Sequence, residues 1–211
     1  VEVFEGDNFW RKNKRVFQDG VGVDLNRNYP FGWDSVCSGS EFVQVSTYKG
    51  PSPASEAETQ TMMAFSEDRH FDKVLDFHSY GSEVLWGYSC HLHPFDQFFE
   101  DEAIALSIES GYGGEERRPS AEGEHYEWQI ATYGNYAFLM ETHIQFQPSF
   151  ESALAEVALV WPGILWFLER PLTISGYVED ACTEDVLGAA VELPGETFSN
   201  GETNTAGGPF G

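Results

Sequence analysis

The chain has 211 residues, of which 41% are hydrophobic, 15% aromatic and 22% charged, enough for one sizeable core or for one domain and part of a second. Its 35 acidic and 11 basic residues give a net charge of −24, and such a surface repels phosphate backbones, which excludes nucleic acid as a partner class. No uninterrupted apolar run of about 18 residues occurs, so we expect no membrane-spanning helix.

The predicted elements alternate between strands and helices. In chain order they are a strand over residues 21–25, a loop over 35–54, a helix from 55 to about 66, strands over 73–78 and 84–88, a helix over 94–110, a loop over 111–125, a strand over 136–142 and an apolar helix over 149–169. Ser55 and Glu58 match a capping box, and Pro162 predicts a kink or a break in the last helix. This order predicts an α/β fold with a mixed, twisted sheet flanked by helices.

The character of the sequence changes after Arg170. Hydrophobic residues within 174–193 recur with period two and are separated by turn residues, which is typical of a β-hairpin. We therefore predict a domain boundary near residue 171, with one domain over 1–170 and the beginning of a second over 171–211.

The cysteine pattern excludes two motifs. No C-x-x-C pair occurs among Cys37, Cys90 and Cys182, so the chain has no zinc ribbon and no thioredoxin-like redox motif. A disulfide between Cys37 and Cys90 is one hypothesis, and buried, reduced thiols are the alternative.

Three polar residues stand at the ends of predicted strands: Arg27, His78 and Glu141. Ligands of α/β sheets bind beyond the carboxyl ends of the strands, so these are candidate functional residues. A single histidine there is more often a core residue, but burying an unpaired glutamate costs roughly several kcal/mol. The segment WRKNKR (10–15) holds four of the eleven cations and would attract an anionic ligand, the alternative being a solvated basic loop.

Five segments carry a resemblance to a known family. They are FWRKNKR (9–15), GVDLNRNYPFGW (22–33), YKGPSPASEAET (48–59), DFHSYG (76–81) and YAFLMET (136–142). Together they resemble the zinc metallocarboxypeptidases of the pancreatic carboxypeptidase A/B and bacterial carboxypeptidase T type. The resemblance implies that residues 1–170 are the C-terminal part of a peptidase M14-like catalytic domain, whose complete form releases C-terminal amino acids from peptides.

The resemblance implies a catalytic role for three residues. His78 matches the third zinc ligand, Glu141 the general base that activates water, and Arg11 the cation that stabilises the tetrahedral oxyanion. These roles agree with chemistry, because a carboxylate within hydrogen-bonding reach accepts a proton and a positioned guanidinium stabilises developing negative charge.

The resemblance also implies substrate-binding residues. Asn26 and Arg27 match the pair that binds the terminal carboxylate of the substrate, a task that suits a planar guanidinium. Tyr80 would line the peptide subsite. Tyr126 falls at the position that reads the substrate side chain and favours neutral or apolar residues, although the acidic loop around Glu124 leaves a basic preference open.

One motif of the family does not occur in this chain. The first two zinc ligands of the family lie in an H-x-x-E motif, and none of the six histidines has a glutamate three positions later. We expect this motif upstream of Val1, so that the chain is a fragment and the zinc ion belongs to the complete protein. The fragment alone would neither hold zinc tightly nor be active, because a catalytic zinc requires three protein ligands. His91 and His93 are interpreted as a surface loop.

Two other functions remain as alternatives. One is a non-catalytic relative that binds peptide C-termini, and the other is a zinc hydrolase of small acylated amino acids. The tail resembles the start of the transthyretin-like β-sandwich of the regulatory carboxypeptidases, which we expect to pack on the catalytic domain. The resemblance implies a secreted protein in an extracellular or periplasmic location, although the first residues, VEVFEGDNFW, show no signal peptide.

Overall fold

The computed structural model describes residues 10–171, 178–183 and 185–187. Its elements in chain order are β1 (Val16–Phe17), β2 (Gly20–Val21), the 3₁₀ helix η1 (Leu25–Arg27), α2 (Ala57–Arg69), β3 (Lys73–His78), β4 (Glu83–Leu85), α3 (Asp96–Glu109), β5 (Glu116–Arg117), α4 (His125–Tyr133), β6 (Tyr136–Glu141), α5 (Phe150–Glu169), β7 (Val178–Glu179) and β8 (Val186–Leu187).

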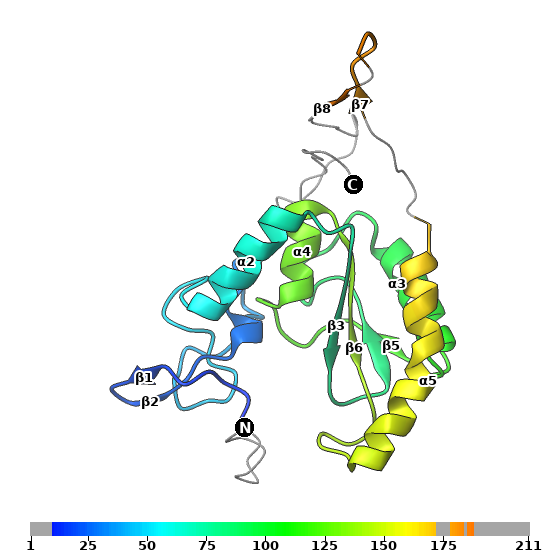
Figure 1. Ribbon diagram of the computed structural model, residues 1–211. Helices are drawn as coiled ribbons and strands as arrows, with labels where there is room; N and C mark the ends of the chain where they lie inside the picture. The colour runs from blue at the N-terminus through cyan, green and yellow to red at the C-terminus, as the bar shows by residue number, and fades with distance from the viewer. Residues whose placement is uncertain (1–9, 172–177, 184, 188–211) are drawn as a thin grey trace.

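Four strands form one mixed sheet in the order β3-β6-β4-β5 (Figure 1). β3 and β6 are parallel, β4 is antiparallel to β6, and β4 and β5 are parallel to each other. The two long strands, β3 and β6, are the apolar segments predicted at 73–78 and 136–142. β6 is buried from Tyr136 to Met140, as expected of a strand inside a sheet that is covered on both faces. The predicted mixed α/β architecture is confirmed.

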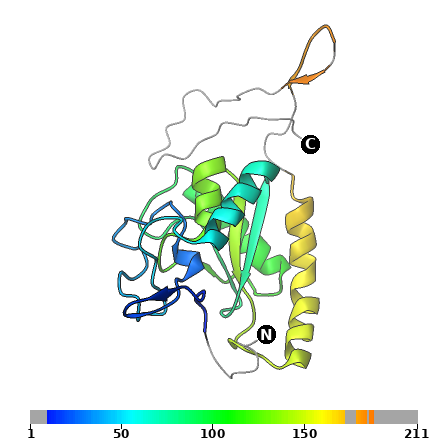
Figure 2. The ribbon, with the colours of Figure 1, turned by 60° about the vertical axis from the view of Figure 1, so that its left-hand side comes forward.

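Helices cover both faces of this sheet, with α2 and α4 on one side and α3 and α5 on the other (Figures 1 and 2). Side chains of the sheet, α3 and α4 form the core, among them Val84, Leu106, Ile130, Phe138 and Leu139. α5 crosses the end of α3 closely at Gly163, where a Cβ atom would lie 2.8 Å from the backbone nitrogen of Ser110. A larger residue at this position would push the two helices apart.

α5 bears on the expectation that no helix of this chain spans a membrane. Within the described residues it is the one helix long and apolar enough, by length and composition, to cross a membrane. The expectation from the sequence was based on uninterrupted apolar runs. Glu156 interrupts such a run in α5, although the helix is apolar on average. In this structure α5 continues through Pro162, buries Val160 and Phe167, and accepts a hydrogen bond at Glu156 from Tyr112. Most of the large apolar side chains of α5 are nevertheless exposed in this chain, among them Leu154, Trp161 and Leu168.

The N-terminal region differs from the predicted strand over 21–25. Gly20–Val21 pairs with Val16–Phe17 in a short antiparallel hairpin, and the chain then turns into η1. The turn is fixed by Asp24, whose side chain accepts a hydrogen bond from the backbone N–H of Asn26 at 3.3 Å. This capping contact ends the extended segment before Leu25.

Two helix starts also differ from the prediction. α2 has Glu56 and not Ser55 at its N-cap, because the Ser55 hydroxyl donates to the Glu56 carboxylate at 2.7 Å. α4 was not among the predicted elements, and it begins at His125, the last residue of the predicted loop over 111–125. Its residues from His125 to Ala131 are all buried, so it lacks the one-sided hydrophobic pattern by which a surface helix is predicted.

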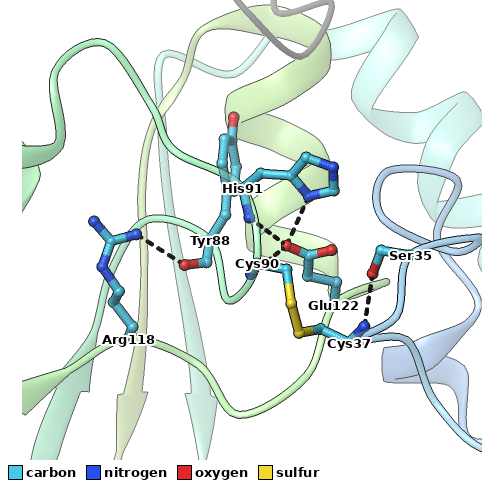
Figure 3. The surroundings of a disulfide bond; sticks show 7 residues. All are labelled: Ser35, Cys37, Tyr88, Cys90, His91, Arg118 and Glu122. Atoms are coloured by element: carbon cyan, nitrogen blue, oxygen red, sulfur yellow. Dashed lines mark hydrogen bonds and ion pairs between the residues drawn. A yellow bond between two sulfur atoms is a disulfide. The ribbon is translucent and has the colours of Figure 1, made fainter.

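Cys37 and Cys90 form a disulfide, which confirms that hypothesis (Figure 3). Beside it, Oε1 of the fully buried Glu122 accepts hydrogen bonds from the backbone N–H groups of Cys90 (2.8 Å) and His91 (3.1 Å) and lies 2.8 Å from His91 Nδ1. The contact gives His91 a structural partner in its loop. His93 is only 7% exposed, so its interpretation as a surface residue is wrong. Cys182 is an exposed, free thiol.

The predicted second domain lies largely outside the described residues. Within 171–211 the structure describes β7 and β8, which pair as an antiparallel hairpin. The transthyretin-like domain and its packing on the catalytic domain stay predictions.

Candidate active site

His78 and Glu141 lie side by side at the carboxyl ends of β3 and β6. The parallel register of the two strands ends with these two residues as partners. The N–H of Thr142 donates to the carbonyl oxygen of His78 at 2.8 Å and holds the two strand ends together. Gly81 leaves room beside the pair, because a Cβ atom there would lie 3.0 Å from the Cβ of Glu141. The sheet thus brings an imidazole and a carboxylate to one edge, where α/β folds bind ligands.

Glu141 is half-buried, and its buried Oε2 has no hydrogen-bond partner within the described part of the chain. Burial raises the pKa of Glu141; the charges of Arg117, Arg11 and Arg27 oppose that rise, and the charge of Glu83 adds to it. A carboxylate with a raised pKa and a free oxygen is suited to accept a proton near neutral pH.

His78 is held towards its neutral form. Burial lowers its pKa, and the positive charges of Arg11 and Arg27 act in the same direction, while Asp76 and Asp24 oppose them. A neutral imidazole is the form that binds metal ions.

Arg11 pairs with a deeply buried acid. One Nη atom of Arg11 lies 2.7 Å from Oδ2 of Asp24, whose side chain is 3% exposed, whereas the side chain of Arg11 is 40% exposed. The N–H of Asp24 donates to the carbonyl oxygen of Tyr48 at 2.8 Å, so the loop carrying Asp24 is fixed. Asp24 therefore holds one side of the Arg11 guanidinium and leaves the rest accessible to a ligand.

η1 presents Asn26 and Arg27, and the loop before α4 packs directly on them. Nη1 of Arg27 donates to Oε1 of Glu124 and to the carbonyl oxygen of Asn26, both at 2.6 Å. Oδ1 of Asn26 accepts a hydrogen bond from the N–H of His125 at 3.0 Å. Gly123 permits this approach, since its φ is +90° and a Cβ atom would lie 2.8 Å from the carbonyl oxygen of Arg27.

Arg11 and Arg27 each influence the pKa values of both His78 and Glu141, so the four groups lie within electrostatic range of one another. Their grouping into one active site stays a prediction. Tyr80 follows His78 by two residues and is 56% exposed, at the rim of the same strand end.

Tyr126 does not lie in the open part of the site. Its side chain is fully buried, and its hydroxyl donates to the carbonyl oxygen of Gly87 at 3.0 Å. A substrate could not contact it in this conformation. The expectation that Tyr126 reads the substrate side chain therefore needs correction, because the residue is used for packing between α4 and the segment after β4.

The sequence analysis did not predict the contacts of three acidic residues near the candidate site. Asp24 and Glu124 pair with the two arginines, and Asp76 lies 2.9 Å from Nδ1 of His125. The sequence does contain one signal for the start of α4, because Glu124 and Glu127 have the three-residue spacing of a capping box. Indeed, Oε2 of Glu127 accepts the N–H of Glu124 at 3.1 Å.

The described residues offer one ligand of a metal site. His78 offers a neutral imidazole at the strand end, but no group of three His, Cys, Asp or Glu side chains able to hold a metal ion lies within the described residues. A zinc site at His78 needs ligands from elsewhere in the complete protein.

Comparison with known proteins identifies the family. The family model described as zinc carboxypeptidase, Peptidase_M14, matches residues 2–156. The chain belongs to the zinc carboxypeptidase family. The Metallocarboxypeptidase A-like protein of Trichophyton verrucosum is 34% identical to it over 111 residues, or 49% of this chain and 26% of that protein. Mast cell carboxypeptidase A of Rattus norvegicus is 36% identical over 98 residues, or 43% of this chain and 23% of that protein.

Other relatives extend the comparison. The carboxypeptidase A from Helicoverpa armigera superposes with a TM-score of 0.65 at 22% identity, over 78% of this chain and 46% of that one, a likeness that shows the fold. A further relative, named Inactive metallocarboxypeptidase ECM14, of Uncinocarpus reesii, is 28% identical over 64% of this chain and 24% of that protein. This zinc carboxypeptidase chain thus spans about a quarter of the curated relatives that it matches.

Proposed function

We propose that the complete protein carrying this chain is a zinc-dependent carboxypeptidase that releases C-terminal amino acids from peptides. The proposal is supported by the adjacent strand ends of His78 and Glu141, by the unpartnered carboxylate oxygen of Glu141, and by the influence of Arg11 and Arg27 on the pKa values of both residues. Binding a free carboxylate and stabilising an oxyanion are tasks for two separate cations, and the chain offers Arg27 in η1 and Arg11 in the segment before β1.

In this proposal Arg27 and Asn26 bind the terminal carboxylate of the substrate. Glu141 accepts a proton from water while the water oxygen bonds to the scissile carbonyl carbon. Glu141 later returns that proton to the leaving amine nitrogen as the C–N bond breaks. Arg11 donates hydrogen bonds to the carbonyl oxygen as it gains negative charge. His78 would be one zinc ligand, and zinc when bound would supply Lewis-acid polarisation and lower the pKa of water.

One feature of the chain bears on the location of such a protein. A disulfide such as Cys37–Cys90 forms and persists in oxidising compartments, which supports an extracellular or periplasmic location. Substrates would be peptides or proteins with a free C-terminus.

The test compares two forms of one peptide. The complete protein should release the C-terminal residue from a peptide with a free carboxylate and leave the C-terminally amidated peptide intact, because the amide removes the charge that Arg27 binds. A chelator should abolish the release. Equal cleavage of both peptides would contradict the proposed role of Arg27.

A non-catalytic protein that binds peptide C-termini is the second candidate. The name of the relative from Uncinocarpus reesii shows that inactive members occur in this family. The same peptide pair separates the two candidates, since a non-catalytic binder would bind the free carboxylate form more tightly than the amide and release nothing from either.

A further inference from the structure

Glu122 is a fully buried carboxylate that the proposed chemistry does not use. Its Oε1 accepts hydrogen bonds from the backbone N–H groups of Cys90 at 2.8 Å and His91 at 3.1 Å (Figure 3). Burial acts to raise its pKa, but hydrogen bonds from Ser35, His91 and the backbone of Cys90 hold the pKa below its usual value. Gly32 makes room for the side chain, since its φ is +68° and a Cβ atom there would lie 2.5 Å from the Cβ of Glu122. A buried, ionised group that is bonded in this way holds its partners in fixed positions.

The backbone of Glu122 is tied to the other half of the disulfide. Its N–H donates to the carbonyl oxygen of Cys37 at 2.9 Å, and Ser38 forms an isolated parallel bridge with it. Because the disulfide joins Cys37 to Cys90, Glu122 contacts both bonded cysteines, Cys37 through its main chain and Cys90 through its side chain.

Two glycines that adjoin this cluster pack on Arg27. A Cβ atom on Gly123 would lie 2.8 Å from the carbonyl oxygen of Arg27, and the carbonyl oxygen of Gly123 accepts the N–H of Tyr29 at 3.1 Å. Gly39, two residues after Cys37, lies against the side chain, since a Cβ atom there would lie 2.9 Å from the Cβ and 3.1 Å from the Cγ of Arg27. Close packing of this kind transmits any shift of the two segments to Arg27.

We propose that Glu122 is a positioning residue for the terminal carboxylate of the substrate. Together with the Cys37–Cys90 disulfide, it holds the segments 37–39 and 122–123 against Arg27 and so sets the place of the guanidinium group. This inference rests on the proposed function, in which Arg27 binds that carboxylate. A guanidinium binds a carboxylate through two parallel hydrogen bonds only in a defined orientation, so a small displacement weakens binding.

The contact with Glu124 has a different task. Nη1 of Arg27 donates to Oε1 of Glu124 at 2.6 Å, which holds the far end of the side chain. The Glu122 cluster holds the backbone and the first carbons of Arg27. Both ends must be held for the guanidinium plane to be fixed.

The test measures kcat and KM of the complete protein for a peptide with a free C-terminal carboxylate. Glu122→Ala should raise KM about 5-fold or more and leave kcat within about 3-fold of the wild type, because the displaced group binds substrate. Partial unfolding would instead lower the concentration of active protein, and therefore kcat, without changing KM. Glu122→Gln should keep KM within about 3-fold of the wild type, because its amide oxygen can accept the same two backbone N–H groups.

Glu102→Ala is the matched control, because Glu102 is another buried acid, in α3, and pairs with Arg170 at the end of α5. It should leave KM unchanged. The double variant Cys37→Ser with Cys90→Ser keeps Glu122 and removes the covalent tie, so it should also raise KM, and it replaces Glu122→Ala if that variant does not fold. A wild-type KM in the folded variants would overturn the inference.

A double-variant cycle tests whether Glu122 acts through Arg27. In the Arg27→Lys protein, Glu122→Ala should raise KM further by less than about 2-fold, since the group that it positions is already lost. Full multiplication of the two single effects on KM would show that Glu122 acts elsewhere and would overturn the inference.

A binding measurement keeps this inference separate from the proposed function. Calorimetry with the complete protein should show tighter binding of N-acetyl-phenylalanine than of its amide, and Glu122→Ala should remove most of the difference. If the wild type cleaves no peptide but shows this behaviour, the proposed function fails and the inference stands. If the wild type is active and Glu122→Ala binds N-acetyl-phenylalanine equally well, the inference fails and the proposed function stands. Equal binding of the acid and the amide by the wild type would contradict both.

Discussion

His78 and Glu141 are paired residues on adjacent parallel strands, and each is the last residue of its strand. Paired residues of parallel strands point to the same side of the sheet, so the candidate zinc ligand and the candidate base lie on one side of it. The pairing follows from two apolar segments that lie about sixty residues apart, which gives the site a rigid base. Arg11, in the segment before β1, and Arg27, in η1, are the cations that would complete the proposed site.

Replacing Arg11 should affect the chemical step more than binding. In the complete protein, Arg11→Met should lower kcat about 100- to 1,000-fold with a small change in KM, because the lost donor acts on charge that develops in the transition state. Steady-state kinetics on one peptide measure both constants. Arg15→Met is the control from the same loop, since Arg15 pairs with Glu56 outside the site. A rise in KM with unchanged kcat would assign Arg11 to substrate binding instead.

Replacing Arg27 should affect substrate binding more than the chemical step. Arg27→Lys keeps a positive charge but loses the planar fork, so we expect KM to rise about 10- to 100-fold with kcat less affected. The amidated peptide provides the reference, because its weak binding should not change further. If Arg27→Lys had the KM of the wild type, the terminal carboxylate would bind elsewhere.

The disulfide predicts a simple thiol count. Denatured, unreduced protein comprising this chain should have one reactive thiol, Cys182, and three after reduction. In the complete protein, the double variant Cys37→Ser with Cys90→Ser should lose about 2–4 kcal/mol of unfolding free energy, because the loop between the cysteines is no longer closed in the unfolded state. Three reactive thiols before reduction would contradict the bond.

Glu124 predicts a pH dependence of stability. Its pKa is raised from 4.5 in a model peptide to about 7 in the fold, so between these values the native state holds a proton that the unfolded state has lost. The unfolding free energy of the wild type should therefore fall relative to that of Glu124→Gln as the pH rises from about 4.5 to 7, by at most about 1.4 kcal/mol per pH unit. Denaturant unfolding of the two proteins across this range measures the difference, and parallel curves would show that Glu124 is not the titrating group.

β3, β6 and α5 could be predicted from the sequence because each is a long, strongly apolar segment. Their hydrophobic pattern is visible without knowledge of the rest of the fold. The sequence also singled out Arg27, His78 and Glu141 as candidates, because they stand next to these segments or in recognisable motifs; their roles stay predictions. The prediction of a strand over 21–25 failed because the cap formed by Asp24 overrides a short alternation of hydrophobic residues.

The acids around the arginines were harder to predict for a different reason. Glu124 meets Arg27 across 97 residues of sequence, and the contact depends on the positive φ of Gly123 and on a helix that is buried on all sides. Tyr126 illustrates the same limit, since a position inferred from spacing lies in the core once α4 forms. Charge pairs made by loops follow from tertiary packing and leave no periodic signal in the sequence.

The most direct test of the candidate site is Glu141→Gln in the complete protein. Gln is nearly isosteric with Glu but cannot accept the proton, so the release of C-terminal residues should fall by about 100-fold or more while the affinity for the peptide and for zinc stays within about 3-fold of the wild type. Glu102→Gln should keep full activity. Wild-type turnover by the Glu141→Gln protein would contradict the assignment of Glu141 as the base, and with it the proposed site.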